Sequence, residues 1–161
     1  MNDIVIREFN LSDMDSIRNL QPDGWDDITF YFYLYSREKF CYPIVALENG
    51  DLIGVANGIS NGRTGWLSHI IVSPEYRRRG IGYRLTSYVI SCLDELGCET
   101  KILIATELGE KLYEKMDFKK TCLYRFYKGD QLNGDIQHEN IRRLADEDID
   151  SVLQLDRMIS G

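Results

Sequence analysis

A loop rich in arginine and glycine is the strongest chemical signal in this sequence. The pattern Arg77-x-x-Gly80-x-Gly82 follows an apolar stretch and runs straight into helix-forming residues. The glycines let the backbone turn tightly, with no Cβ in the way. The first N–H groups of the following helix have no partner inside the helix, so together with the positive end of the helix dipole they form an anion site. The spacing therefore predicts a site for a pyrophosphate, surrounded by the cations of Arg77, Arg78, Arg79 and Arg84.

Other phosphate-binding loops fit this stretch less well. The nucleotide-triphosphate pattern G-x-x-x-x-G-K-[ST] is absent. The dinucleotide pattern G-x-G-x-x-G needs a third glycine, and Leu85 stands at that position. The remaining pattern also matches many exposed turns, in which the arginines would form only a solvated basic patch. The loop is therefore informative only together with its surroundings.

With its surroundings, the loop resembles that of the GNAT acetyltransferase superfamily, in which R/Q-x-x-G-x-G/A holds the pyrophosphate of acetyl-CoA. A second stretch, residues 105–118, resembles the family's L-Y-E-x-x-G-F segment. Asp117 stands where glycine is usual, but aspartate tolerates a left-handed turn, so we expect the turn to be kept. The resemblance covers roughly residues 3–128. It implies an N-acetyltransferase, an acyltransferase that transfers the acetyl group from its co-substrate acetyl-CoA directly to a primary amine of a small molecule or peptide, without a metal.

The resemblance also implies where acetyl-CoA binds. The fourth and fifth strands of the family's sheet splay apart, and the pantetheine arm enters the gap and pairs with the backbone of the fourth strand. The pyrophosphate then meets the amides of residues 78–83. The implied acetyl-CoA site consists of Ile70, Ile71, Val72, Arg77, Arg78, Arg79, Gly80, Ile81, Gly82 and Tyr83.

Tyr113 is the candidate general acid. Attack of an amine on a thioester expels a thiolate, which a nearby phenol can protonate. The resemblance places Tyr113 at the position of the family's acid. The alternative is an amphipathic tyrosine that packs against the fifth strand.

The general base is not readable from the sequence. An amine with a pKa near ~10 must lose a proton before it attacks, and family members often place the base on the fourth strand. The matching positions are Trp66 and Ser68, which cannot accept the proton. Strand alternation faces His69 away from Ser68, which predicts a hydrogen-bonded core histidine. Glu107, just after the fifth strand, and a water relay both stay open.

An aromatic run at residues 25–35 is a candidate wall of the acceptor pocket. Aromatic faces attract ammonium groups, and Asp26 and Asp27 add negative charge. The alternative is that Phe30, Phe32 and Tyr33 belong to the core. The candidate acceptor residues are Trp25, Asp26, Tyr31 and Ser68.

The elements that must position these residues follow from hydrophobic periodicity and turn signals. A capping box at Ser12–Asp15 predicts the start of the first helix. The mixed order predicts an α/β or α+β domain of three layers, and the resemblance implies a mixed sheet of about six to seven strands, splayed between strands four and five and flanked by about four helices. The expected strands are 4–6, 43–47, 52–59, 66–72, 101–105 and 118–128, and the expected helices are 12–20, 25–40, 81–96 and 108–116.

The composition restricts the functional class. The 161 residues include 19 Lys and Arg and 26 Asp and Glu, a net charge of −7. Such a chain is a poor non-specific ligand for nucleic acid, because phosphate neutralisation needs clustered cations. No apolar run approaches the ~20 residues that span a bilayer, and no secretory signal is visible, so we expect no membrane partner. The four cysteines lack C-x-x-C spacing, which favours reduced thiols in a cytoplasmic protein over a metal site.

The C-terminal residues repeat the N-terminal ones at an offset of 135. Six residues recur in Ile141, Arg142, Asp148, Asp150, Ser151 and Leu155. We therefore expect a GNAT domain at residues 1–130, followed at 131–161 by a linker and a strand-helix appendage that resembles the start of a second such domain. The alternative is that the similarity is fortuitous, because any strand followed by an acidic amphipathic helix has this residue pattern. We further expect Ile149, Val152 and Leu155 to be buried against the first domain or against a second copy in a homodimer.

Two other functional classes stay open beside the enzyme. The missing base on the fourth strand motivates a non-catalytic acyl-CoA-binding or regulatory module. An interaction scaffold is the third possibility, in which the arginine–glycine loop would be idle.

Overall fold

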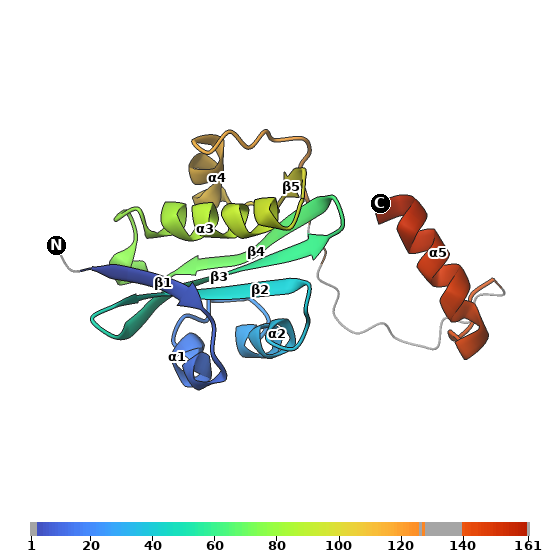
Figure 1. Ribbon diagram of the computed structural model, residues 1–161, viewed down its shortest axis with the longest axis horizontal. Helices are drawn as coiled ribbons and strands as arrows, with labels where there is room; N and C mark the ends of the chain where they lie inside the picture. The colour runs from blue at the N-terminus through green and yellow to red at the C-terminus, as the bar shows by residue number, and fades with distance from the viewer. Residues whose placement is uncertain (1–2, 126, 128–139, 161) are drawn as a thin grey trace. The chain divides into compact units, whose positions relative to one another are not determined.

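The computed structural model describes residues 3–125, 127 and 140–160, and the chain divides into unit 1, Met1–Phe118, and unit 2, Lys119–Gly161. A mixed sheet forms the centre of unit 1 (Figure 1). Its five strands follow one another in space in their chain order; the first four are antiparallel, and the last is parallel to its neighbour. They are β1 (Ile4–Glu8), β2 (Cys41–Glu48), β3 (Asp51–Asn61), β4 (Thr64–Val72) and β5 (Thr100–Ile102).

Helices cover both faces of this sheet, which gives the predicted three layers (Figure 1). On one face, α1 (Met14–Arg18) and α2 (Ile28–Tyr35) pack over one apolar cluster. On the other face, α3 (Ile81–Glu95) packs over a second cluster, and α4 (Glu107–Glu114) lies on the same side. None of the helices in the described part of the chain is long and apolar enough to cross a bilayer.

The helix predicted at residues 81–96 is confirmed by α3. Ile81, Leu85, Val89 and Leu93 are buried against the sheet. Each fully buried aliphatic side chain contributes about 1.5–3 kcal/mol, so this face holds the helix firmly. This packing therefore fixes the position of the N-terminal end of α3, where the sequence predicts the anion site.

Two predicted strands differ from those observed. β5 spans only Thr100–Ile102, and residues 118–125, which were predicted to begin a sixth strand, have no regular secondary structure. The described sheet thus has five strands rather than about six to seven. The physical reason is that a strand needs a ladder partner, and the short β5 offers few free backbone groups to a further strand. Residues 126 and 128 of the predicted strand lie outside the described residues.

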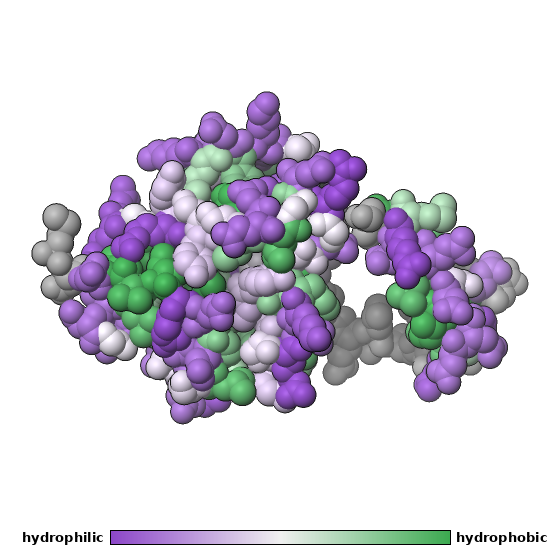
Figure 2. Space-filling view, in the orientation of Figure 1, coloured by the Kyte–Doolittle hydropathy of each residue, from purple (hydrophilic) through white to green (hydrophobic). Residues whose placement is uncertain are grey.

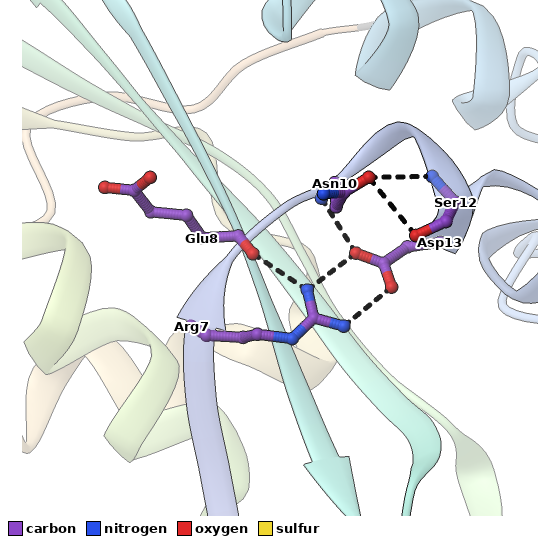
Figure 3. A network of polar contacts seen from close by, with 5 residues as sticks. All are labelled: Arg7, Glu8, Asn10, Ser12 and Asp13. Atoms are coloured by element: carbon purple, nitrogen blue, oxygen red, sulfur yellow. Dashed lines mark hydrogen bonds and ion pairs between the residues drawn. The ribbon is translucent and has the colours of Figure 1, made fainter.

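A bidentate ion pair joins β1 to the first helical turn (Figure 3). Arg7 Nη1 and Nη2 donate to the two carboxylate oxygens of Asp13 at 2.8 and 2.7 Å. The capping box is formed by Asn10 and Asp13, not at Ser12–Asp15 as predicted, since Asn10 N–H donates to Asp13 Oδ2 at 2.8 Å and Asn10 is the N-cap. These hydrogen bonds, chiefly from Arg7, hold the pKa of Asp13 below its usual range.

We expect Arg7→Ala to lower the free energy of unfolding of unit 1 by about 2 kcal/mol, because it leaves a buried carboxylate without its cation. Since the pKa of Asp13 is lowered, this stabilisation is present above about pH 4 and is lost as the pH falls through the folded-state pKa. The difference from wild type, measured by urea denaturation, should therefore shrink in acid. Arg142→Ala in unit 2 is the matched control. Equal stability of Arg7→Ala and wild type at neutral pH would contradict the role of the pair.

Unit 2 reproduces this hydrogen-bonding pattern. Arg142 Nη1 and Nη2 donate to the two oxygens of Asp148, each at 2.6 Å, and Ala145 N–H donates to Asp148 Oδ2 at 2.9 Å. A 3-10 turn, Asp146–Asp148, then leads into α5 (Ile149–Ser160), as Leu11–Asp13 leads into α1. The ion pair, the turn and the helix therefore recur, but the strand expected before them does not, because residues 141–145 have no regular secondary structure. The start of a second GNAT-like domain stays a prediction.

The apolar positions of the two copies differ in burial. Ile17 is fully buried in unit 1, whereas its equivalent Val152 is 47% exposed. Ile149 and Leu155 are exposed to a similar degree, so the described residues of unit 2 leave the apolar face of α5 uncovered (Figure 2). Burial of this face in a homodimer stays a prediction.

If a second copy covers α5, Val152→Asp should shift the full-length chain from dimer to monomer. An aspartate at this position would be buried without a partner, and we expect it to weaken association by more than about tenfold. Sedimentation velocity over a range of protein concentrations measures this. Gln154→Asp, an exposed residue of the same helix, is the control. Wild-type chain that sediments as a monomer at all concentrations would contradict the dimer.

Candidate active site

A cleft opens where β4 and β5 part. The two strands pair only from Thr64 opposite Thr100 to Trp66 opposite Ile102, and β4 then continues to Val72. The cleft has a volume of about 730 Å³ and is lined by β4, by the loop before α3 and by the segment from β5 into α4. The predicted splay between the fourth and fifth strands is thus confirmed in this sheet.

A β-bulge in β4 brings His69 into this cleft. Val55 of β3 is opposite Ile71 of β4, while Asn57 is opposite Ser68, so His69 and Ile70 together face the one residue between Val55 and Asn57. His69 has a φ of +49°, which is uncommon for a residue other than glycine and marks the bulge. The prediction that His69 faces away from the site is wrong, because the bulge breaks the alternation on which it rests, whereas the predicted hydrogen bond of this histidine is present. His69 and Ser68 both line the cleft.

Aromatic side chains of α2 and of the loop before it surround the His69 ring. The Tyr35 hydroxyl lies 3.0 Å from His69 Nδ1, and the Tyr31 ring centroid lies 4.9 Å from that of the imidazole. Trp25 approaches the ring edge-on at 6.0 Å. Burial among these groups lowers the pKa of His69 from its usual value. The imidazole is therefore neutral at pH 7 and able to accept a proton.

The predicted anion loop has the conformation that an anion site requires. Arg78 and Gly80 have φ angles of +63° and +81°, and Gly80 is the N-cap of α3 with no side-chain cap. The amides of Ile81, Gly82 and Tyr83 thus form an uncapped helix start. Gly82 was predicted to allow a tight turn, but its role in the structure is a different one. It lies within α3, where a Cβ would come 3.2 Å from Leu112 Cδ2, so glycine keeps α3 and α4 close.

The four arginines of the loop separate into two pairs. Arg77 and Arg78 line the cleft, and Arg77 Nε also donates to the Val72 carbonyl at 3.0 Å, which ties the loop to the end of β4. Arg84 Nη2 donates to the Ile4 carbonyl at 2.7 Å and does not line this cleft.

Arg79 has a structural partner. Its guanidinium donates to both carboxylate oxygens of Glu48 at 2.5 and 3.1 Å and lies 5.3 Å from the centroid of the Tyr76 ring. Glu48 is buried, so it holds this cation in place. Arg79 is not among the residues that line the cleft, so its prediction as an acetyl-CoA residue is not supported by the geometry.

The remaining predicted acetyl-CoA residues lie together. Ile70, Ile71 and Val72 line the cleft from β4, and the loop and the start of α3 continue the same wall. Lys111 and Lys115 also line it and were missed by the sequence reasoning. Their spacing of four residues places both on one face of a helix, which is the signal that could have found them. The cleft therefore combines an apolar strip, uncapped amides and cations, which fits the arm and the phosphates of acetyl-CoA.

Tyr113 lines the cleft from α4, as the resemblance implied. Its ring packs edge-on against Phe118 at 5.9 Å, and burial raises the pKa of Tyr113 to about 12. The hydroxyl therefore keeps its proton at neutral pH, as a general acid must. Asp117 has a φ of +63°, so the left-handed turn expected at this position is confirmed.

The other predicted site residues are divided between the cleft and its surroundings. Trp25 and Ser68 line the cleft. Tyr31 packs on His69 without lining the cleft, and Asp26 is exposed, with its carbonyl accepting from a glutamine side chain. Glu107 is exposed at the start of α4 and does not line the cleft, so the structure gives no support to it as a base.

A mixed sheet split beside an arginine–glycine loop defines a GNAT-type domain. The model of the Acetyltransferase (GNAT) family matches residues 7–118. The chain belongs to this family.

Curated relatives of the chain include two proteins named N-alpha-acetyltransferase 30. The protein from Dictyostelium discoideum is 31% identical over 124 residues, which are 71% of this chain and 65% of the relative. The protein from Schizosaccharomyces pombe is 27% identical over 130 residues, 74% of this chain and 84% of the relative. The chain thus spans just under two thirds of the Dictyostelium protein.

Solved structures share the fold at lower identity. Aminoglycoside N-acetyltransferase AAC(6')-Iy in complex with CoA has a TM-score of 0.66 at 20% identity, over 80% of this chain and 96% of the enzyme. Glucosamine-6-phosphate N-acetyltransferase from Arabidopsis thaliana has a TM-score of 0.65 at 17% identity, over 80% of this chain and 99% of the enzyme. These are likenesses of fold.

Proposed function

We propose that this chain is an acetyl-CoA-dependent N-acetyltransferase in which a primary amine attacks the acetyl group directly. The observation that carries the proposal is that His69 and Tyr113 line one cleft, where burial moves their pKa values in opposite directions. A neutral imidazole and a protonated phenol are the base and the acid that amide formation from a thioester needs. No metal ion is required for this chemistry.

The wall formed by β4 and the α3 loop is proposed to hold acetyl-CoA, which when bound supplies an acetyl thioester. The backbone of residues 70–72 faces the cleft where β4 has lost its ladder with β5. The uncapped amides of residues 81–83 can bind the pyrophosphate, and the cations of Arg77, Arg78, Lys111 and Lys115 can neutralise phosphate charge.

Two side chains handle the protons. His69 accepts the proton that the amine nitrogen loses as it bonds to the acetyl carbon. Tyr113 donates its hydroxyl proton to the sulfur as the carbon–sulfur bond breaks, so the products are an amide and a free thiol. Both groups are in the required protonation state at neutral pH, because burial lowers the pKa of His69 and raises that of Tyr113 to about 12.

The acceptor is proposed to be a primary amine of a peptide or small molecule. A peptide α-amine is the first choice, because the curated relatives are named N-alpha-acetyltransferases. Pro22 and Trp25 line the cleft together with His69, the proposed base, so an amine can lie there against apolar and aromatic surface. We place the reaction in the cytoplasm, as the cysteine pattern predicts.

The alternative of a non-catalytic acyl-CoA-binding module loses its motivation. It rested on the missing base on the fourth strand, and the bulge supplies His69 at that place.

Thiol release from acetyl-CoA on a panel of peptides and small amines tests the proposal, with calorimetry of CoA binding in parallel. We expect CoA to bind and an amine on the panel to release thiol and gain an acetyl mass. Binding without acetylation of any amine would favour the non-catalytic module. Absence of CoA binding would overturn both.

A further inference from the structure

Three polar side chains, of Asn57, Ser68 and Tyr35, lie next to His69 or to its neighbours. Asn57 is fully buried, and its Nδ2 donates to Ser68 Oγ at 3.2 Å. The Tyr35 hydroxyl lies 3.0 Å from His69 Nδ1. Three elements, β3, β4 and α2, thus contribute polar side chains at or next to the imidazole.

The imidazole nitrogen that remains is Nε2. Since Nδ1 is engaged by Tyr35, a proton that reaches His69 from the cleft is taken up at Nε2. For Nε2 to be free, the neutral ring must carry its proton on Nδ1, so that Nδ1–H donates to the Tyr35 oxygen. The imidazolium donates from both nitrogens and keeps this hydrogen bond. A hydroxyl oxygen has two lone pairs, so the Tyr35 oxygen can accept Nδ1–H in both states of the ring.

We propose that Tyr35 is a positioning residue for catalysis: its oxygen accepts Nδ1–H, which holds His69 with an unprotonated Nε2 toward the cleft, and it keeps this hydrogen bond when Nε2 takes the proton of the amine. The proposal rests on the proposed function of His69 as base. It gives a reason for the Tyr35 hydroxyl in the layer between α2 and the sheet, where a phenylalanine could pack equally well.

Among the groups around His69, Tyr35 is the one placed to accept the hydrogen bond from Nδ1–H. On α2, the neighbours of the ring besides Tyr35 are Tyr31 and Phe32, and Trp25 comes from the preceding loop. The titratable groups that line the cleft with His69 are the phenols of Tyr76, Tyr83 and Tyr113 and the cations of Arg77, Arg78, Lys111 and Lys115. None of these lining groups is a carboxylate. The stabilising acceptor for an imidazolium is thus the Tyr35 oxygen.

Tyr35→Phe tests the proposal, because it removes the hydroxyl and keeps the ring. We expect kcat to fall by about 10- to 100-fold, the value of one hydrogen bond to a charged group, with CoA affinity unchanged. Loss of the acceptor disfavours the imidazolium, so the acid limb of the kcat/KM profile should move to lower pH. Tyr33→Phe is the matched control, since Tyr33 lies on the same helix with an exposed side chain.

Two further measurements separate this role from a structural one. In a His69→Gln background, Tyr35→Phe should have no additional effect on kcat, since Tyr35 acts through the imidazole. An NMR titration of the His69 ring in the full chain, assigned with His138→Gln, should show a lower pKa in Tyr35→Phe than in wild type. This titration does not depend on activity, so it remains decisive even if no acceptor amine is found. An unchanged His69 titration, or equal losses in both backgrounds, would overturn the proposal.

Discussion

Tyr113→Phe is expected to lower kcat by about 10²–10⁴-fold, the usual range for a positioned general acid, while CoA affinity stays the same. The substitution removes only the hydroxyl that would protonate the leaving sulfur. The ring keeps its edge-on packing against Phe118, so the fold should be unaffected. Because burial raises the pKa of Tyr113 to about 12, ionisation of this group should not reduce the wild-type rate until the pH approaches that value.

The rate must be measured where chemistry is limiting, for example in single turnovers with excess enzyme. Tyr88→Phe on α3, a partly exposed tyrosine that does not line the cleft, is the control for loss of a hydroxyl. A Tyr113→Phe enzyme as fast as wild type in single turnovers would show that Tyr113 is only a packing residue.

Gly80→Val is expected to weaken CoA binding by about 10- to 100-fold in a folded protein. Gly80 has a φ of +81°, and a β-branched residue there costs about 1–3 kcal/mol or changes the loop. No atom lies within 4 Å of a Cβ at this position, so the effect comes from backbone conformation and not from a clash. Calorimetric titration with CoA measures the affinity.

Gly97→Val is a closely matched control. Gly97 has a φ of +79° and equally open surroundings, but it follows the other end of α3. Both variants should lose similar stability, and only Gly80→Val should lose affinity. Gly80→Asn, which tolerates the left-handed region, should recover part of the binding. Undiminished CoA affinity of Gly80→Val would remove the pyrophosphate site from this loop.

The anion loop and the candidate acid could be singled out from the sequence because their signals are local, and most of these residues line the cleft. A helix start after Gly80 creates its free amides from the backbone of neighbouring residues alone. Asp117 could be expected to keep its turn because a left-handed conformation depends on one residue. The three layers followed from the alternation of strand and helix periods along the chain.

The base and the arginine assignments depended on partners that lie far away in the sequence. His69 reaches the cleft because β3 and β4 differ by one residue between two ladder pairs, and no pattern within β4 shows this. Arg79 turns to Glu48, which is 31 residues away, so its neighbours in the loop do not predict its direction. The sixth strand was predicted from its apolar pattern, but pairing requires an edge that the short β5 does not offer.

Unit 2 also separates what local sequence decides from what tertiary structure decides. The sequence alone determined its ion pair and turn, since Arg142, Ala145 and Asp148 are close enough to repeat the pattern of Arg7, Asn10 and Asp13 without any other element. Burial was decided by tertiary structure. Ile17 is covered because α2 and the sheet lie against it, whereas the described residues of unit 2 provide no such layer for Val152. Hydrogen bonds between near neighbours form wherever the residues recur, but an apolar face is buried only where a second surface packs against it.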